Sequence, residues 1–189
     1  MRYLLIVLTV KLSLIILANF QLLGNPNPVR HEMRVVSYEL IQNDSFFNWL
    51  HFEVKQFRDV QYVQLNFSLR VVLTPYRVEG ELIKCKEYFI DCADHRSLEL
   101  KNICAGLDAA FFFISIGYKN REIKCPFKGD YLVQNLTYSK SVIPMAFAPT
   151  EKWWEYSFKV KVRIYDANSM VTNLKGQAYI LTFRRKNGH

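Results

Sequence analysis

The polar residues with the densest spacing are Asp91, Asp94, His95 and Ser97, which together offer an acid, a base and a nucleophile. Members of a catalytic triad normally come from separate elements of a fold, so residues this close in sequence rarely converge. They fit a solvated loop beside Cys92 better. The chain also has no G-x-S-x-G elbow and no glycine-rich phosphate loop. We therefore expect a protein that is not an enzyme.

Histidines and cysteines also lack the spacing of a metal centre. No C-x-x-C pair occurs, and the four histidines are scattered along the chain. Structural zinc sites normally show clustered ligands. The sequence therefore predicts neither a metal nor another cofactor.

The first 24 residues predict export. Arg2 precedes two apolar runs separated by Lys11, and a polar Asn-Pro-Asn-Pro segment follows them. This order is typical of a secretory signal peptide, although roughly 20 apolar residues also suffice for a membrane anchor. Ala18 and Gly24 both suit the cleavage position. We take residues 1–24 as the signal peptide and expect residues 25–189 to form a single secreted, extracellular domain.

Four cysteines follow the predicted signal peptide: Cys85, Cys92, Cys104 and Cys125. An even number in an exported chain indicates disulfides, and four cysteines allow three pairings. Partners that are neighbours in sequence give the simplest pairing, Cys85 with Cys92 and Cys104 with Cys125.

Three N-glycosylation sequons begin at Asn43, Asn66 and Asn135. A glycan requires an exposed asparagine. Asn43 is the best candidate because Asp44 beside it favours a turn, whereas Asn66 lies in a strand pattern and is usable only if it faces solvent. The sequence thus predicts a glycoprotein.

A formal net charge of +8 makes nucleic acid a partner to consider, with Lys159, Lys161 and Arg163 as the basic face. Export argues against nucleic acid. On a strand that faces solvent, such charges most often serve solubility, and the alternative is a contact with anionic lipid headgroups at a membrane surface.

Period-2 alternation dominates the chain, most clearly at 156–165, where apolar and polar residues alternate. Half of all residues are apolar, with 14 Phe and 11 Tyr, so a sizeable core is expected. Further strands are predicted at 35–41, 46–57, 62–73, 79–85, 130–138 and 177–184, with a turn at 166–169 closing the last hairpin. The segment 104–118 does not alternate and fits a short helix or a buried strand. The pattern predicts an all-β, two-sheet antiparallel sandwich.

The inward faces of the last two strands are expected to carry Phe158, Val160, Val162, Ile164, Tyr179, Leu181 and Phe183. These side chains either fill the core or line an apolar cavity between splayed sheets. Trp153 and Trp154 fit a cavity mouth or ordinary packing equally well. The candidate cavity residues are Phe111, Phe113, Trp153, Trp154, Tyr156, Phe158, Val160, Val162 and Ile164.

The segment from Lys124 to Tyr131 contains a Cys-Pro-x-x-Gly-x-Tyr pattern, and Asn135-Leu136 and Ile143-Pro144 follow it. The alternating segment 98–104 lies upstream and ends at a cysteine. This order resembles an insect-expanded family of small secreted proteins that includes the chemosensory CheA and CheB proteins. That family is similar to the ganglioside activator protein of the ML lipid-recognition superfamily.

The resemblance implies an immunoglobulin-like β-sandwich whose sheets part to form a lipid-binding cup, with no catalytic residues. It also implies a Cys104–Cys125 disulfide and a role in handling contact pheromones. We therefore expect a secreted, non-enzymatic binder of a hydrophobic small molecule or lipid. The alternative is a secreted interaction module, with a packed core, that binds a receptor or another protein. An enzyme is the third reading and would need a polar cleft.

Overall fold

The computed structural model describes residues 29–58, 60–111, 114–138, 152–167 and 169–184. The predicted signal peptide lies outside the described residues. The chain divides into two compact units. One is His31–Leu181, which contains the architecture described below. The other comprises Met1–Arg30 and Thr182–His189, of which the structure describes only strand ends, at 29–30 and 182–184.

The described elements are mainly strands. In chain order they are β1 (Val29–Gln42), β2 (Phe47–Phe57), β3 (Val60–Leu69), β4 (Pro75–Cys85), the 3-10 turn η1 (Glu87–Phe89), β5 (Ala93–Lys101), the helix α2 (Ile103–Phe111), β6 (Ile114–Ser115), β7 (Tyr118–Lys119), β8 (Asp130–Tyr138), the 3-10 turn η2 (Trp153–Glu155), β9 (Ser157–Asp166) and β10 (Ser169–Arg184).

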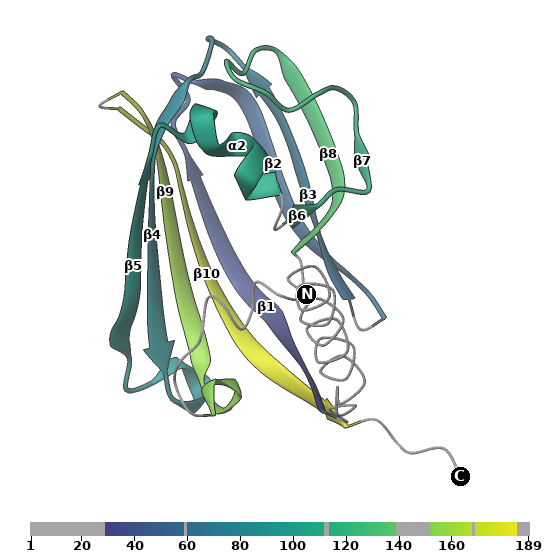
Figure 1. The fold of residues 1–189 in the computed structure, drawn as a ribbon, viewed down its shortest axis with the longest axis vertical. Helices are drawn as coiled ribbons and strands as arrows, with labels where there is room; N and C mark the ends of the chain where they lie inside the picture. Colours follow the sequence, from purple (N-terminus) through teal and green to yellow (C-terminus); the bar gives the residue numbers. More distant parts are fainter. Residues whose placement is uncertain (1–28, 59, 112–113, 139–151, 168, 185–189) are drawn as a thin grey trace, which may run out of the picture. The chain divides into compact units, whose positions relative to one another are not determined.

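Two antiparallel sheets pack against each other, which confirms the predicted sandwich (Figure 1). The first, called here the β9 sheet, has the strand order β1-β10-β9-β4-β5. The second, the β3 sheet, has the order β2-β3-β8-β6, and β7 also pairs with β8. The helix α2 contacts both β4 and β6, and it lies between the two sheets at one end (Figure 1). Of the segment 104–118, expected as a short helix or a buried strand, the part up to Phe111 is thus a helix, which begins at Ile103.

The hairpin of β9 and β10 has the predicted turn, with Ser169 paired to Asp166. Its second strand, however, begins at Ser169 rather than 177 and faces the opposite way from our expectation. Ala178 pairs with Phe158, and both are almost fully buried, whereas Leu181 is 36% exposed. The large side chains at 179 and 181 therefore do not face the interior, because the register places the small Ala178 opposite Phe158.

Other strands also differ from the sequence prediction: β1 and β4 begin earlier than expected, at 29 and 75. The strand expected at 62–73 ends at Leu69, and Leu73 instead forms an isolated bridge with Phe127. The edge strand β5 was not predicted over its full length, because only the part from 98 onward alternates. All its residues except His95 are exposed, and it pairs with β4 alone. A strand at a sheet edge needs little apolar character to pair.

Among the described residues the buried core forms two clusters, and Cys85, Val133 and Ala178 are buried outside them. The Tyr131 cluster joins both sheets and contains Phe47, Leu69, Leu73, Tyr131 and Val171. The Phe158 cluster contains Phe158 and Ile180, with Met33, Leu82, Tyr138, Trp153 and Tyr156 packed against them. Because Ile164 packs on the first cluster and Phe158 belongs to the second, the two clusters lie at opposite ends of β9.

Candidate ligand-binding interior

Between the two clusters, the inner face of the β9 sheet is only partly buried. Phe158, Val160, Val162 and Ile164 share one face of β9, because side chains alternate along a strand. Phe158 is 1% exposed, and Ile164 packs on the Tyr131 cluster. Val160 and Val162 lie between them and are only partly buried. The inner face of β9 is therefore buried at Phe158 and only partly buried from Val160 to Ile164, whereas on the other sheet Val133 of β8, which pairs with Leu65, is 2% exposed.

Glycines occupy the inner face at this middle level. Val162 pairs with Gly80 on β4, and Val160 pairs with Gly176 on β10. A Cβ added at Gly80 would come no closer than 4.0 Å to Leu98, and one at Gly176 would lie 3.7 Å from the Ser37 carbonyl oxygen. No close contact therefore requires glycine at either position. Glycine inside a strand often marks a place that a ligand approaches closely.

The inner face reaches solvent along β5. Leu98 pairs with Gly80, and Leu100 pairs with Val78, so both leucines share the face of Val162. They are nevertheless 58% and 47% exposed. Two leucines on an inner face with such exposure indicate that the sandwich is not closed over this edge.

The other sheet supplies apolar side chains to the same interior. Phe67 of β3 packs on the Tyr131 cluster, and alternation places Leu65 and Val63 on its face. They pair with Phe52 and Val54 on β2, and these four side chains are all partly buried. Aromatic and aliphatic groups therefore line both walls.

The predicted cavity residues separate into three groups. Trp153, Tyr156 and Phe158 lie in the Phe158 cluster, Ile164 packs on the Tyr131 cluster, and Val160 and Val162 lie between the clusters. Phe111 is the last residue of α2, and Phe113 lies outside the described residues. Sequence analysis missed Gly80 and Gly176, because only the register shows that they pair with the inward valines.

The tryptophan pair forms an aromatic group with His31. The His31 ring stacks on Trp154, with centroids 4.7 Å apart, and meets Trp153 edge-on at 5.2 Å. Burial lowers the pKa of His31. Trp153 also packs on the Phe158 cluster, whereas Trp154 is 36% exposed. Ordinary packing accounts for Trp153, and Trp154 lies at the surface.

The Cys-Pro-x-x-Gly-x-Tyr segment has a structural role in the Tyr131 cluster. Tyr131 is 2% exposed and stacks on Phe67 at 4.8 Å. Gly129 has φ 78°, a left-handed conformation that favours glycine, and its carbonyl oxygen accepts a hydrogen bond from the Leu69 amide at 3.1 Å. Phe127 and Leu73 exchange backbone hydrogen bonds. The segment thus anchors β8 to the end of β3.

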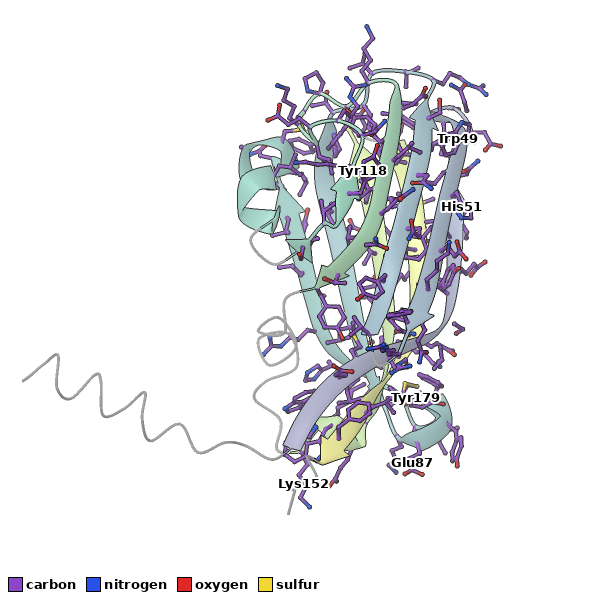
Figure 2. All side chains as sticks on the ribbon, turned by 90° about the vertical axis from the view of Figure 1, so that its right-hand side faces the viewer. Trp49, His51, Glu87, Tyr118, Lys152 and Tyr179 are labelled. Carbon is purple, nitrogen blue, oxygen red and sulfur yellow. A yellow bond between two sulfur atoms is a disulfide. The ribbon has the colours of Figure 1, made fainter. Side chains whose placement is uncertain are left out.

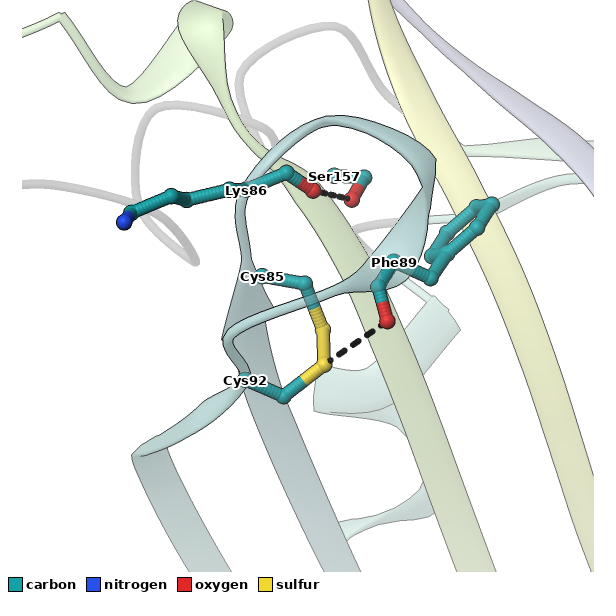
Figure 3. The surroundings of a disulfide bond; sticks show 5 residues. All are labelled: Cys85, Lys86, Phe89, Cys92 and Ser157. Carbon is teal, nitrogen blue, oxygen red and sulfur yellow. Dashed lines mark hydrogen bonds between the residues drawn. A yellow bond between two sulfur atoms is a disulfide. The ribbon is translucent and has the colours of Figure 1, made fainter.

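Both disulfides form with the neighbour pairing, Cys85–Cys92 and Cys104–Cys125, with Cα atoms 4.0 and 5.5 Å apart. Cys85–Cys92 closes a short loop (Figure 3). The hydroxyl of Ser157, the first residue of β9, donates to the Lys86 carbonyl oxygen of this loop at 2.6 Å. The Phe89 ring lies 4.7 Å from that of Tyr179 on β10. The loop is therefore held to both β9 and β10.

That loop exposes two large apolar residues. Tyr88 is 78% exposed and Ile90 is 58% exposed. Tyr88, Phe89 and Asp91 all have positive φ, between 47° and 59°. Backbone strain of this kind persists only where the surrounding structure imposes it, and here a disulfide closes the loop.

The outer face of the β9 sheet carries a network of ion pairs. Arg163 donates to Glu79 at 2.9 Å and to Glu81 at 2.8 Å, and the Tyr165 hydroxyl donates to Glu79 at 3.0 Å. These hydrogen bonds, Arg163 first, lower the pKa of Glu79, and the bond to Glu79 raises the pKa of Arg163. Arg77 lies over the Tyr165 ring at 4.2 Å. Arg163 therefore pairs with carboxylates of its own sheet and is not a free cation that could bind a partner.

The polar residues considered for catalysis do not converge. Asp91 lies in the loop, where it accepts a hydrogen bond from Lys86 at 2.9 Å. Asp94 and Ser97 lie on β5 and not in a loop, opposite Ile83 and Glu81 on the outer face. The His95 ring lies 6.3 Å from Phe158, on the inner side. A surface pocket of about 440 Å³ is lined by Asp94, His95 and Ser97, among other residues. Ser97 and His95, however, belong to opposite faces of the strand.

The three sequons differ in accessibility. The Asn43 Nδ2 donates to the Met170 carbonyl oxygen at 2.9 Å, and its Oδ1 accepts from the Ser45 amide. Asn66 Oδ1 is buried. Asn135 is exposed, and its Oδ1 accepts from Gln64 at 3.3 Å. This geometry favours Asn135 over Asn43 as a glycan acceptor.

Comparison with known proteins assigns no family. No family model matches the chain, and no curated protein matches it. In the part of the chain that the structure describes, no helix has both the length and the apolar character needed to cross a membrane. No group of three His, Cys, Asp or Glu residues in this part has a geometry that would hold a metal ion.

Proposed function

We propose that the protein is a secreted, non-enzymatic carrier of a hydrophobic small molecule or lipid, held between its two sheets. The observation that carries the proposal is the inner face of β9. Phe158 at one end is buried and Ile164 at the other packs against the Tyr131 cluster, while Val160 and Val162 between them are partly buried outside both clusters and pair with glycines. A ligand site is typically concave and lined by apolar side chains.

Energetics make such binding feasible. An apolar ligand that buries about 300 Å² against this interior would gain about 7 kcal/mol, at 25 cal/mol per Å², before the costs of ordering it. The leucines at 98 and 100 offer apolar surface along the exposed edge, through which a ligand enters. The resemblance to the family of chemosensory CheA and CheB proteins, which is similar to a lipid-recognition protein, further supports a lipid or contact pheromone as the cargo.

The test is native mass spectrometry of protein secreted from insect cells, with lipid extraction. We expect a stoichiometric apolar molecule on the wild-type chain and its loss in Gly80→Leu, because the leucine occupies the middle of the inner face. Gly106→Ala, on α2, is the matched control and should retain the ligand, because nothing lies within 4 Å of its added Cβ. A clean apo mass after exposure to cuticular lipids would reject the carrier function.

The loop closed by Cys85–Cys92 favours a second function, a secreted module that binds a receptor or another protein. Tyr88 and Ile90 are held outward on it. Aromatic residues are enriched at protein interfaces. In this case Tyr88→Ser would abolish partner capture and leave any bound lipid unchanged, which separates the two functions.

A further inference from the structure

A groove of about 440 Å³ crosses the outer face of the β9 sheet, over strands β1, β10, β9 and β4. It lies on the side opposite the apolar interior. The lining residues that belong to the outer face are Ser37, Glu39, Ile83, Lys159, Lys161, Lys175 and Gln177. Tyr38, Val160 and Gly176 complete the lining. This volume lies within the range of small-molecule sites, roughly 300–1,000 Å³.

Three lysines converge in this groove. Lys175 of β10 is directly opposite Lys161 of β9, and Lys159 lies two residues from Lys161 on the same face. Like charges directly opposite each other destabilise a sheet. Carboxylates on the two flanking strands offset part of this repulsion, and a bound anion would offset the remainder.

The nearby carboxylates compensate only part of this charge. Glu39 pairs with Lys175 at 2.9 Å. Glu81 lies 3.7 Å from Lys161, but it also accepts a shorter bond from Arg163 at 2.8 Å. Among the residues that the structure describes, Lys159 has no ion pair. The groove therefore retains positive charge.

A neutral donor adds to the lysines. The Ser37 hydroxyl donates to Gln177 Oε1 at 3.0 Å, which orients the amide and leaves Gln177 Nε2 as a donor in the groove. Gln177 pairs with Lys159, which pairs with Ile83 on the other side. An amide donor, an ammonium group and an apolar side chain thus lie in one row across three strands.

We propose that this groove binds a phosphate or sulfate group carried by a small organic molecule. Lys159 binds the oxyanion together with Lys161, whose carboxylate partner Glu81 is shared with Arg163. Gln177 donates a hydrogen bond to it, and Ile83 contacts the apolar part of the molecule. Charge-assisted hydrogen bonds to phosphate are among the strongest in proteins. The site differs from the basic face read from the sequence, because Arg163 is occupied by Glu79 and Glu81, whereas Gln177 joins from β10.

The test titrates inorganic phosphate and glycerol 3-phosphate into the secreted, full chain and follows amide NMR shifts. We expect the Gln177 and Lys159 amides to shift, and Lys159→Gln to weaken binding by about tenfold, equivalent to about 1.4 kcal/mol. Lys128→Gln is the matched control, since it removes the same charge from an exposed position near β8. Its affinity should stay within about twofold of wild type.

A second arm distinguishes the source of the oxyanion. Phosphatidylcholine vesicles with and without phosphatidic acid are sedimented with wild-type and Lys159→Gln protein. Binding that needs both phosphatidic acid and Lys159, without a response to the soluble phosphates, assigns the group to a lipid headgroup and supports the site. Equal weakening by Lys159→Gln and Lys128→Gln, or no Lys159-dependent binding in either arm, would overturn the proposal.

Discussion

Replacing Gly80 by leucine tests whether the middle of the sandwich is hollow. Gly80 does not have a positive φ, so a larger residue introduces no backbone strain, and its Cβ would meet only Leu98, at 4.0 Å. Replacing a strand glycine gains about 0.5–1 kcal/mol from lost freedom of the unfolded chain. Burying about half of a leucine adds about 1 kcal/mol. We expect the free energy of unfolding to rise by about 1.5–2 kcal/mol.

If the interior is already filled, Gly80→Leu should instead lower the free energy of unfolding. Extra atoms in a well-packed core typically cost about 1–3 kcal/mol. Urea denaturation with the same m-value for both proteins measures the difference. Gly117→Ala is a control for overpacking, because its Cβ would lie 2.8 Å from the Asn135 Cβ, and it should destabilise. If Gly80→Leu destabilises in the same way, the reasoning about the interior is wrong.

Three further predictions concern the outer face, a disulfide and a sequon. Because Arg163 lowers the pKa of Glu79 below 4.5, that pair stabilises the fold above this pH, and the contribution is lost on acidification. Arg163→Gln should therefore weaken the pH dependence of the free energy of unfolding between about pH 6 and about pH 3, roughly 1.5 units on either side of that value, and an unchanged dependence would contradict this. Replacing Cys104 and Cys125 together by serine should lower the free energy of unfolding in urea by about 3 kcal/mol, and an unchanged midpoint would contradict this. Asn135→Gln should remove one glycan from the secreted protein on a mobility gel; an unchanged mobility would exclude that site.

Local patterns in the sequence were sufficient for the features that depend on neighbouring residues. Alternation from Tyr156 to Tyr165 predicted β9, and the turn residues after it predicted the hairpin. The simplest pairing of the four cysteines is the one observed. In each case the signal is contained in about ten to twenty consecutive residues, so no long-range information was needed.

Features that depend on register were not predictable. The face of β10 that points inward is decided by the pairing of Ala178 with Phe158, not by the size of Tyr179 and Leu181. A shift of one residue reverses the face of every side chain, so a short segment with apolar residues on both sides is ambiguous. The opposition of Lys175 and Lys161 depends on the same register, which is why the outer groove was not found from sequence.

Ion pairs on the outer face of the β9 sheet offset the apolar contacts that its inner face lacks. A sheet whose middle carries glycines on its inner side loses apolar contacts there, since packing scales with the area buried. On the other side of the same strands, Arg163 spans Glu79 and Glu81, and Tyr165 completes the network. Partly buried, multiply bonded pairs of this kind stabilise more than isolated surface pairs. The ion pairs of the β9 sheet thus join its central strands at the level of Gly80 and Val162, so the fold does not depend on the proposed apolar ligand for support there.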